Sequence, residues 1–412
     1  MDALLADVTR QTRAAELVGK PQLDAVSRLF ATLWLPVAVK AGLRHALLAP
    51  RTVERFTAGF ASAWRLRVNF CCPARDDVLM ALFVCAGCGA ELTAPVARVA
   101  LPAHADQQYG HELLPALMAP GTYAVNPEPS GPPWRWWQEV GEAEAASRGV
   151  YAPVDALSYG SAGAVAVAPG DTRGMALIPD RCEGYCLGLD GRAGPNLACV
   201  DCGRAVATRV DDCSFWQAVW LDPDAVRRVD GAAVDWAPDS VPPVEEPLDW
   251  SPVWTAAAGV ALAHLLVASG GAPVALPPGM VTDMFGHVLD ALLPPGPPAV
   301  TAALAGPDLP APDCDIALVP VHPRTGTPWR LPGAAIVPVA APVWQHLAFQ
   351  HDAPSMPATR GLLPDDLPPQ QPWVPFRPDA QVFLDTLARL PEVRRPWLRE
   401  IYDRVRTFPR PF

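Results

Sequence analysis

Lysine is almost missing from this 412-residue chain, which has it only at Lys20 and Lys40. The 43 acidic residues outnumber the 32 basic ones, and the net charge is −11. Nucleic-acid binding needs a basic surface that displaces counterions from phosphate groups. The overall charge therefore argues against a general DNA- or RNA-binding protein, although it leaves room for a local basic face.

Long apolar runs and targeting signals are also lacking. The best candidate for a membrane span, 253–268, is too short and contains His264. The first residues include Asp2, where a secretory signal would have basic residues. We therefore expect a cytoplasmic protein with no membrane association. In a reducing cytosol, Cys-x-x-Cys pairs indicate metal ligands or redox centres before they indicate disulfides.

The common catalytic motifs are absent as well. The sequence has no His-Glu-x-x-His, no Gly-x-x-x-x-Gly-Lys phosphate loop and no Gly-x-Ser-x-Gly. Zinc deaminases place His-x-Glu before Pro-Cys-x-x-Cys, whereas here the order is reversed and the proline is missing. We predict no catalytic residue and no organic cofactor, and the sequence favours a binding or scaffold protein over an enzyme.

Proline, in contrast, is abundant at 50 residues, and half of the chain is hydrophobic. Proline lacks a backbone N–H and fixes φ, so short elements joined by rigid loops are expected. The patterns predict an α+β fold with a helical N-terminal segment, a short-stranded zinc-ribbon region and an α/β C-terminal region. The expected boundaries are a helical extension over 1–79, a zinc-knuckle β-rich domain over 80–236, a linker over 237–250 and an α+β domain over 251–412.

The first 79 residues differ in composition from the rest. They hold both lysines, only four prolines and a net charge of +4 (11 basic, 7 acidic), against −15 (21 basic, 36 acidic) for the remaining 333 residues. One interpretation is that the native protein starts at Met80 and that the extension is an over-long gene start. A weaker hypothesis is that this basic segment binds nucleic acid.

Hydrophobic spacing predicts the main elements behind this segment. The predicted strands are 81–84, 96–101, a hairpin of 164–168 with 175–178, 316–321 and 334–339. The predicted helices are 143–148, 225–229, one that begins after Ser251, one marked by Val281 to Leu292, and two in the C-terminal tail.

Four of the ten cysteines form a Cys-x₃-Cys pair and a Cys-x₂-Cys pair, at Cys182, Cys186, Cys199 and Cys202. Zinc prefers four thiolate or imidazole ligands in a tetrahedron, and two ligands this close in sequence can face one ion when the backbone turns tightly. The residues between the pairs are rich in glycine and suit a loop. We predict a zinc ion held by these four cysteines.

A second knuckle, Cys85-Ala-Gly-Cys88-Gly, supplies only two ligands. The nearest downstream donors are His104 and His111, and we predict that they complete a second zinc site. Two alternatives stay open. Cys71 and Cys72 could contribute from upstream, or the knuckle could pair with Cys199 and Cys202 as a split ribbon, which leaves Cys182 and Cys186 over.

Other arrangements of these residues are less favoured. Cys85, Cys88 and one of the two histidines, with Glu112 as base, would make a zinc-dependent hydrolase, because a catalytic zinc keeps an open position. Cys213 is a fifth ligand candidate for the second cluster, but a small buried hydrophobic residue is the simpler interpretation. Cys314 has no partner nearby in the sequence.

The stretch from Met80 to about Val229 resembles a group of uncharacterised zinc-ribbon (Cys-x₂-Cys knuckle) proteins of high-GC actinobacteria. The motifs that carry the resemblance are Cys85-Ala-Gly-Cys88-Gly-Ala-Glu-Leu, Tyr109-Gly-His-Glu-Leu, and Cys182 to Cys186 with Cys199 to Cys202. The resemblance implies zinc binding and no particular activity. With the Trp- and Pro-rich loop 127–137 as contact surface, we expect a protein partner.

Overall fold

The computed structural model describes residues 78–408, apart from 130, 183, 185, 235–240, 242, 246–248, 350–371 and 373. These residues belong to one compact unit, Asp76–Phe412. The predicted helical N-terminal segment lies outside the described residues as far as residue 77, and its last two residues, 78 and 79, begin a strand. Cys71, Cys72 and the nucleic-acid hypothesis attached to that segment also lie outside the described residues.

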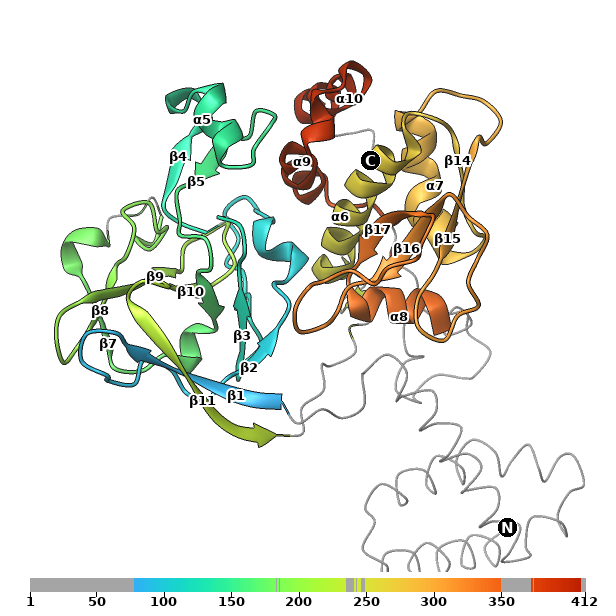
Figure 1. The fold of residues 1–412 in the computed structure, drawn as a ribbon. Helices are drawn as coiled ribbons and strands as arrows, with labels where there is room; N and C mark the ends of the chain where they lie inside the picture. Colours follow the sequence, from blue (N-terminus) through green and yellow to red (C-terminus); the bar gives the residue numbers. More distant parts are fainter. Residues whose placement is uncertain are drawn as a thin grey trace, which may run out of the picture. The chain divides into compact units, whose positions relative to one another are not determined.

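The first half of the described chain is built on a seven-stranded sheet (Figure 1). Its neighbours are antiparallel except for the first two strands, which are parallel. The order across the sheet is β2 (Ala97–Val99), β3 (Thr122–Val125), β6 (Val165–Val167), β10 (Ala218–Leu221), β9 (Ala205–Val210), β8 (Leu197–Cys199) and β7 (Met175–Leu177).

A long two-stranded ribbon crosses this sheet. It pairs β1 (Val78–Cys85) with β11 (Val226–Val234) in antiparallel register, and Cys85 lies opposite Val226. Alternate residues of β1, namely Ala81, Phe83 and Cys85, belong to the core cluster, and Val84 is buried outside that cluster. The smaller elements of this half are β4 (Trp134–Trp136), paired with β5 (Ala156–Ser158), helix α5 (Glu142–Ser147), and the 3-10 turns η1 (Ala103–Asp106), η2 (Trp137–Glu139), η3 (Pro169–Asp171) and η4 (Pro179–Arg181).

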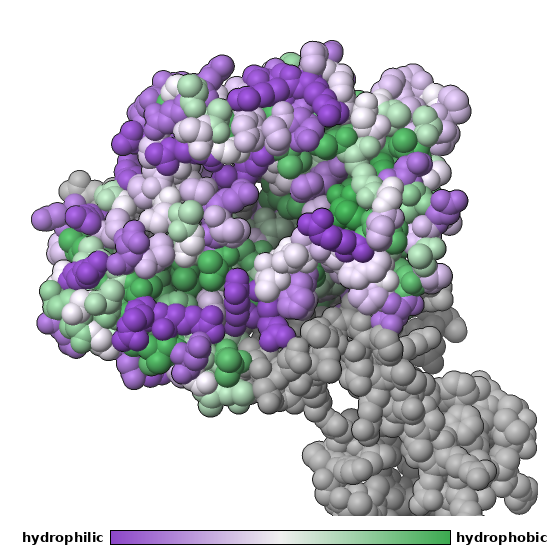
Figure 2. Space-filling view, in the orientation of Figure 1, coloured by the Kyte–Doolittle hydropathy of each residue, from purple (hydrophilic) through white to green (hydrophobic). Residues whose placement is uncertain are grey.

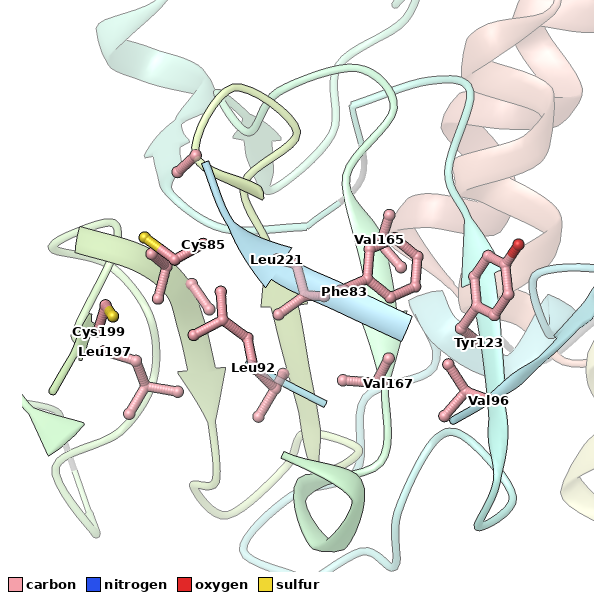
Figure 3. Close-up of a cluster of buried hydrophobic side chains, with 14 of the residues drawn as sticks. Phe83, Cys85, Leu92, Val96, Tyr123, Val165, Val167, Leu197, Cys199 and Leu221 are labelled. Carbon is pink, nitrogen blue, oxygen red and sulfur yellow. The ribbon is translucent and has the colours of Figure 1, made fainter. Parts of the chain in front are cut away.

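The buried side chains between the ribbon and the sheet form one hydrophobic cluster (Figure 3). Phe83 and Tyr123 meet edge to face, with ring centroids 5.1 Å apart. Cys85 and Cys199 lie at the opposite end of this cluster from that ring pair. The two buried thiols therefore continue the core of the β-rich half.

The second half contains a four-stranded parallel sheet with helices around it (Figure 1). Helix α6 packs against β16, β17 and α9, and α8 packs against β16. The sheet order is β14 (Val274–Ala275), β15 (Val300–Leu304), β16 (Ile316–Pro320) and β17 (Ala335–Val339). The helices are α6 (Pro252–Ser269), α7 (Met280–Leu292), α8 (Ala341–Phe349), α9 (Ala380–Arg389) and α10 (Pro396–Thr407), with η6 (Pro391–Arg394) between the last two and a short β12 (Val244–Glu245) and β13 (Asp249–Trp250) pair before α6.

Among the described helices, α6 is the one with the length and apolar composition of a membrane span. Its residues are 61% buried inside the protein, which is the environment of a core helix. Trp254, Leu262 and Leu265 are each at most 1% exposed. Hydrophilic and hydrophobic residues are interspersed over the face drawn in Figure 2.

Most of the predicted elements behind residue 79 are confirmed. Strands occur in 81–84, 96–101, 316–321 and 334–339, and helices in 143–148, after Ser251, over 281–292 and twice in the tail. The fold of the described residues is a mixed α+β fold with several sheets.

Two local predictions are wrong. Segments 164–168 and 175–178 each contain a strand, but β6 pairs with β3 and β10 whereas β7 pairs with β8, so they form no hairpin. Residues 226–229 of the predicted helix 225–229 are the start of β11, because pairing with β1 outweighs the weak local helical pattern.

Candidate metal centre

The first knuckle is the tight turn at the end of β1. The N–H of Cys85 donates to the carbonyl of Ala90 at 2.8 Å, and the N–H of Gly89 donates to the carbonyl of Cys85 at 2.9 Å. Gly89 has φ 82°, a left-handed conformation that glycine adopts without strain. This turn leads from Cys85 to Cys88 within three residues and leaves both thiols on the same side for one ion.

The second knuckle, at the end of β8, repeats these bonds. The N–H of Cys199 donates to the carbonyl of Arg204 at 2.9 Å, and that of Gly203 donates to the carbonyl of Cys199 at 2.8 Å. Gly203 has φ 72°. Cys202 thus has the place that Cys88 has in the first turn, and the two Cys-x-x-Cys-Gly segments are two copies of one local structure.

The segment between β10 and β11 brings the two knuckles together. Cys85 is paired with Val226, and the N–H of Asp222 donates to the carbonyl of Val206 in β9 at 2.9 Å. The guanidinium of Arg204 donates to the carbonyl of Asp224 at 2.9 Å. The end of β1 is therefore held beside the β8–β9 turn, although the knuckles are more than one hundred residues apart in the chain.

Four sulfur atoms converge where the knuckles meet. The Sγ atoms of Cys85 and Cys202 are 3.6 Å apart, as are those of Cys88 and Cys199. All four lie within 4.8 Å of one another. Sulfur ligands at about 2.3 Å from a tetrahedral ion such as zinc are roughly 3.8 Å apart. The four thiols thus fit a tetrahedral metal ion closely.

Two of the four thiols are buried and two are exposed to solvent. Cys85 and Cys199 are each 1% exposed and belong to the core cluster of Figure 3, whereas Cys88 and Cys202 are exposed. An ion here would therefore lie at the edge of the core, with its inner ligands fixed by packing. This is the environment of an ion that holds two segments together.

The thiols influence one another's protonation. Burial raises the pKa of Cys85, but hydrogen bonds from the N–H groups of Cys88 and Gly87 and from the thiol of Cys202 have the larger, opposite effect. The net result is a pKa lowered to about 7. For Cys88, the N–H of Ala90 lowers the pKa, but burial and the three neighbouring thiols raise it to about 12. The thiol pKa values separate because one thiolate opposes the next, and a divalent cation would remove that opposition.

A second group of donors lies elsewhere in the same half. It consists of His111, Cys186 and Cys213, whose ligand atoms are all within 4.8 Å of one another. The Nδ1 atom of His111 is 3.9 Å from the Sγ of Cys186 and 3.8 Å from the Sγ of Cys213. His111 and Cys186 are exposed and Cys213 is half-buried.

The buried carboxylate of Asp212 fixes the backbone at this second group. It accepts N–H bonds from Leu187 at 2.9 Å, Cys213 at 2.7 Å and Cys186 at 3.3 Å. Burial raises the pKa of Asp212, but these N–H groups lower it to below its usual value. Asp212 therefore holds the two cysteine-bearing segments side by side.

The grouping of ligands differs from the one expected from the sequence. Cys199 and Cys202 join Cys85 and Cys88, as in the split ribbon, and not Cys182 and Cys186. Among the described residues, Cys182 belongs to neither donor group, and its thiol lies 3.2 Å from the carbonyl of Ile178. Spacing along the chain identified the local pairs but not which pairs meet.

The two histidines also lie differently from expectation. His104 is a buried residue of η1, and its ring packs on Trp216 with centroids 4.5 Å apart. Burial lowers its pKa to about 4, so it is a neutral core histidine near neutral pH. His111 joins Cys186 and Cys213 and is not at the first knuckle.

The sequence favoured a role for Cys213 as a small buried hydrophobic residue, but its thiol is one of three converging donors. The signal for it lies in the motif Asp211-Asp212-Cys213-Ser214, where an acidic residue that can accept backbone N–H bonds precedes a thiol. Cys314 is half-buried and belongs to neither group.

Comparison with known proteins adds no relationship: no family model, no curated protein and no solved structure matches this chain.

Proposed function

We propose that this protein is a cytoplasmic zinc-binding protein in which Cys85, Cys88, Cys199 and Cys202 hold a structural zinc ion, and that it acts as a binding or scaffold module. The observation that carries this proposal is the convergence of four sulfur atoms from two copies of one knuckle. Four thiolates favour zinc over magnesium or calcium, which prefer oxygen ligands.

The closed ligand set supports a structural role. A catalytic zinc has three protein ligands and a water molecule, whereas this centre has four thiols in place. The hydrolase alternative needed a histidine beside Cys85 and Cys88, and His104 is instead buried against Trp216. A zinc-ribbon relationship of the kind found in actinobacteria agrees with this role and remains part of the proposal.

The contact surface we propose is a cleft of about 460 Å³ beside the Trp- and Pro-rich loop. Trp134 and Phe215 stack in its wall with centroids 5.4 Å apart, and Trp136 is 52% exposed at its edge. Arg135 and Asp385 add charges of both signs to the lining. Aromatic and arginine side chains in a concave site are typical of residues that dominate protein interfaces. We therefore propose a protein partner that inserts an apolar side chain.

Metal analysis of the full chain tests the zinc proposal. The protein purified from zinc-containing medium should retain zinc through dialysis, and Cys88→Ser or Cys202→Ser should release one equivalent. Cys314→Ser is the matched control, because that thiol belongs to neither donor group, and it should release none. A wild-type protein that retains no metal, or a Cys88→Ser protein with unchanged zinc, would show that the proposal is wrong.

The partner proposal has a separate test. Trp136→Ala should leave the zinc content unchanged and reduce capture of a partner from a lysate of the native host. Equal capture by the wild type and this variant would place the contact surface elsewhere.

A further inference from the structure

The second donor group has the composition and the geometry of a metal site of its own. A nitrogen and a sulfur bound to one tetrahedral zinc ion are roughly 3.5 Å apart, from bond lengths of about 2.0 and 2.3 Å. The nitrogen of His111 is 3.9 Å from Cys186 Sγ and 3.8 Å from Cys213 Sγ. A closure of a few tenths of an ångström would bring both nitrogen–sulfur distances to this value, and the two sulfur atoms already lie within 4.8 Å of each other.

The supporting structure at this group is already in place. Asp212 is only 3% exposed, and its carboxylate accepts hydrogen bonds from the N–H groups of Leu187, Cys186 and Cys213. A side chain added at Gly184 would come within 2.9 Å of the same carboxylate and 2.7 Å of the backbone of Gly188. The loop is thus packed closely around Asp212, which fixes both cysteines before any ion binds.

Backbone conformation gives a second, independent observation. Among the described residues other than glycine, three have positive φ, and two of these are His111 (φ 53°) and Ser214 (φ 74°). Hydrogen bonds hold them to each other and to Glu112: the hydroxyl of Ser214 accepts from the N–H of His111 at 3.3 Å, and the N–H of Ser214 donates to the carbonyl of Glu112 at 2.9 Å. Such conformations are unfavourable for ordinary residues and concentrate at functional sites.

We infer that His111, Cys186 and Cys213 form a second metal site, which binds a zinc-class divalent cation through three protein ligands and keeps its fourth position open. Two thiolates and an imidazole select zinc, or a comparably soft transition metal, over magnesium and calcium. Three protein ligands leave room on a tetrahedral ion for a water molecule or an added ligand.

The surroundings of the site account for the open position. Cys186 and His111 are exposed, so a small molecule in solution reaches the ion directly. Cys182 is the nearest further cysteine in the chain, but its thiol is turned to the carbonyl of Ile178 at 3.2 Å. The site therefore differs from the four-thiol centre in the number of protein ligands and in its exposure to solvent. It also allows a ligand at the open position to exchange with solution.

Metal content and cobalt spectra of the full chain test this inference. We expect two equivalents of zinc in the wild type and one in His111→Asn and Cys213→Ser, with two retained in the control Cys314→Ser. Asparagine tolerates the positive φ of position 111, so His111→Asn removes the ligand without added backbone strain. Two equivalents in both variants, or a Cys186–Cys213 disulfide in the reduced-purified protein, would overturn the inference.

The Cys88→Ser protein loaded with cobalt isolates the second site from the first. Excess imidazole or azide should change its ligand-field bands, because each can take the open position, and Cys182→Ser should leave both the bands and the metal content unchanged. Bands that do not respond, or a loss of one equivalent in Cys182→Ser, would mean four protein ligands and would refute the open position. If only the four-thiol proposal is wrong, the outcome is different: the wild type should then hold one equivalent of zinc, which is lost in His111→Asn and retained in Cys88→Ser.

Discussion

Replacing Cys199 with serine is the sharpest perturbation of the four-thiol centre. Its sulfur lies 3.6 Å from that of Cys88, 111 positions away in the chain. An ion shared by these residues acts as a cross-link, and in the chain-entropy model a loop of about 100 residues contributes about 4.7 kcal/mol. The β1–β11 pairing already restricts the same loop, so we expect the metal-dependent stability to be about 3–4 kcal/mol.

The assay separates the loss of metal from the change of side chain. Serine at a position that is 1% exposed also buries a hydroxyl group, at a cost of about 1–3 kcal/mol. Unfolding of wild type and Cys199→Ser should therefore be measured with and without a chelator. The chelator should lower the wild-type transition by roughly 10 °C, at about 2–4 °C per kcal/mol. It should lower the transition of the variant far less, only by what an ion at His111, Cys186 and Cys213 contributes.

Cys314→Ser provides the matched control, and its transition should respond to the chelator as the wild type does. The reasoning is refuted if Cys199→Ser keeps its full chelator response. It is also refuted if the chelator removes the metal from the wild type without changing its stability.

Three further predictions concern other parts of the described chain. The pKa of His104 is about 4 in the fold against 6.5 for a free histidine, so the unfolded chain binds the proton first as the pH falls. The unfolding free energy should therefore fall by about 3 kcal/mol between pH 6.5 and pH 4. His104→Leu should flatten this part of the curve of unfolding free energy against pH. Gly89→Ala should cost about 1–2 kcal/mol in urea unfolding because φ is 82° there, whereas Gly87→Ala, whose added methyl would meet neighbours no closer than 3.6 Å, should cost less than about 0.5 kcal/mol. Tyr402→Phe should cost about 1–2 kcal/mol, because the hydroxyl of this buried residue donates to the carbonyl of Pro153 at 2.5 Å. Tyr159→Phe removes an exposed hydrogen bond to Glu144 and should change the unfolding free energy little; equal costs for the two tyrosines would contradict this reasoning.

The sequence alone predicted the elements whose hydrophobic patterns are local. The strand within 316–321 is a continuous apolar run that is buried throughout. The strand within 334–339 and the helix over 281–292 each repeat apolar residues on one face. The failure at 225–229 has the opposite cause. Those residues form part of β11 because β1, more than 140 positions earlier in the chain, pairs with them, and no pattern within the segment records that partner.

The same division runs through the candidate metal centre. Each Cys-x-x-Cys-Gly knuckle is determined by its own sequence, because glycine at the left-handed position and hydrogen bonds across five residues make the turn. Which knuckles meet was decided only by the tertiary structure. The bonds of Asp222 and Arg204 with neighbouring segments place Cys85 beside Cys202, and the fold leaves Cys186 to join Cys213 and His111. Ligand type is thus a local property of the chain, whereas ligand partnership is a property of strand pairing over distances that residue spacing does not encode.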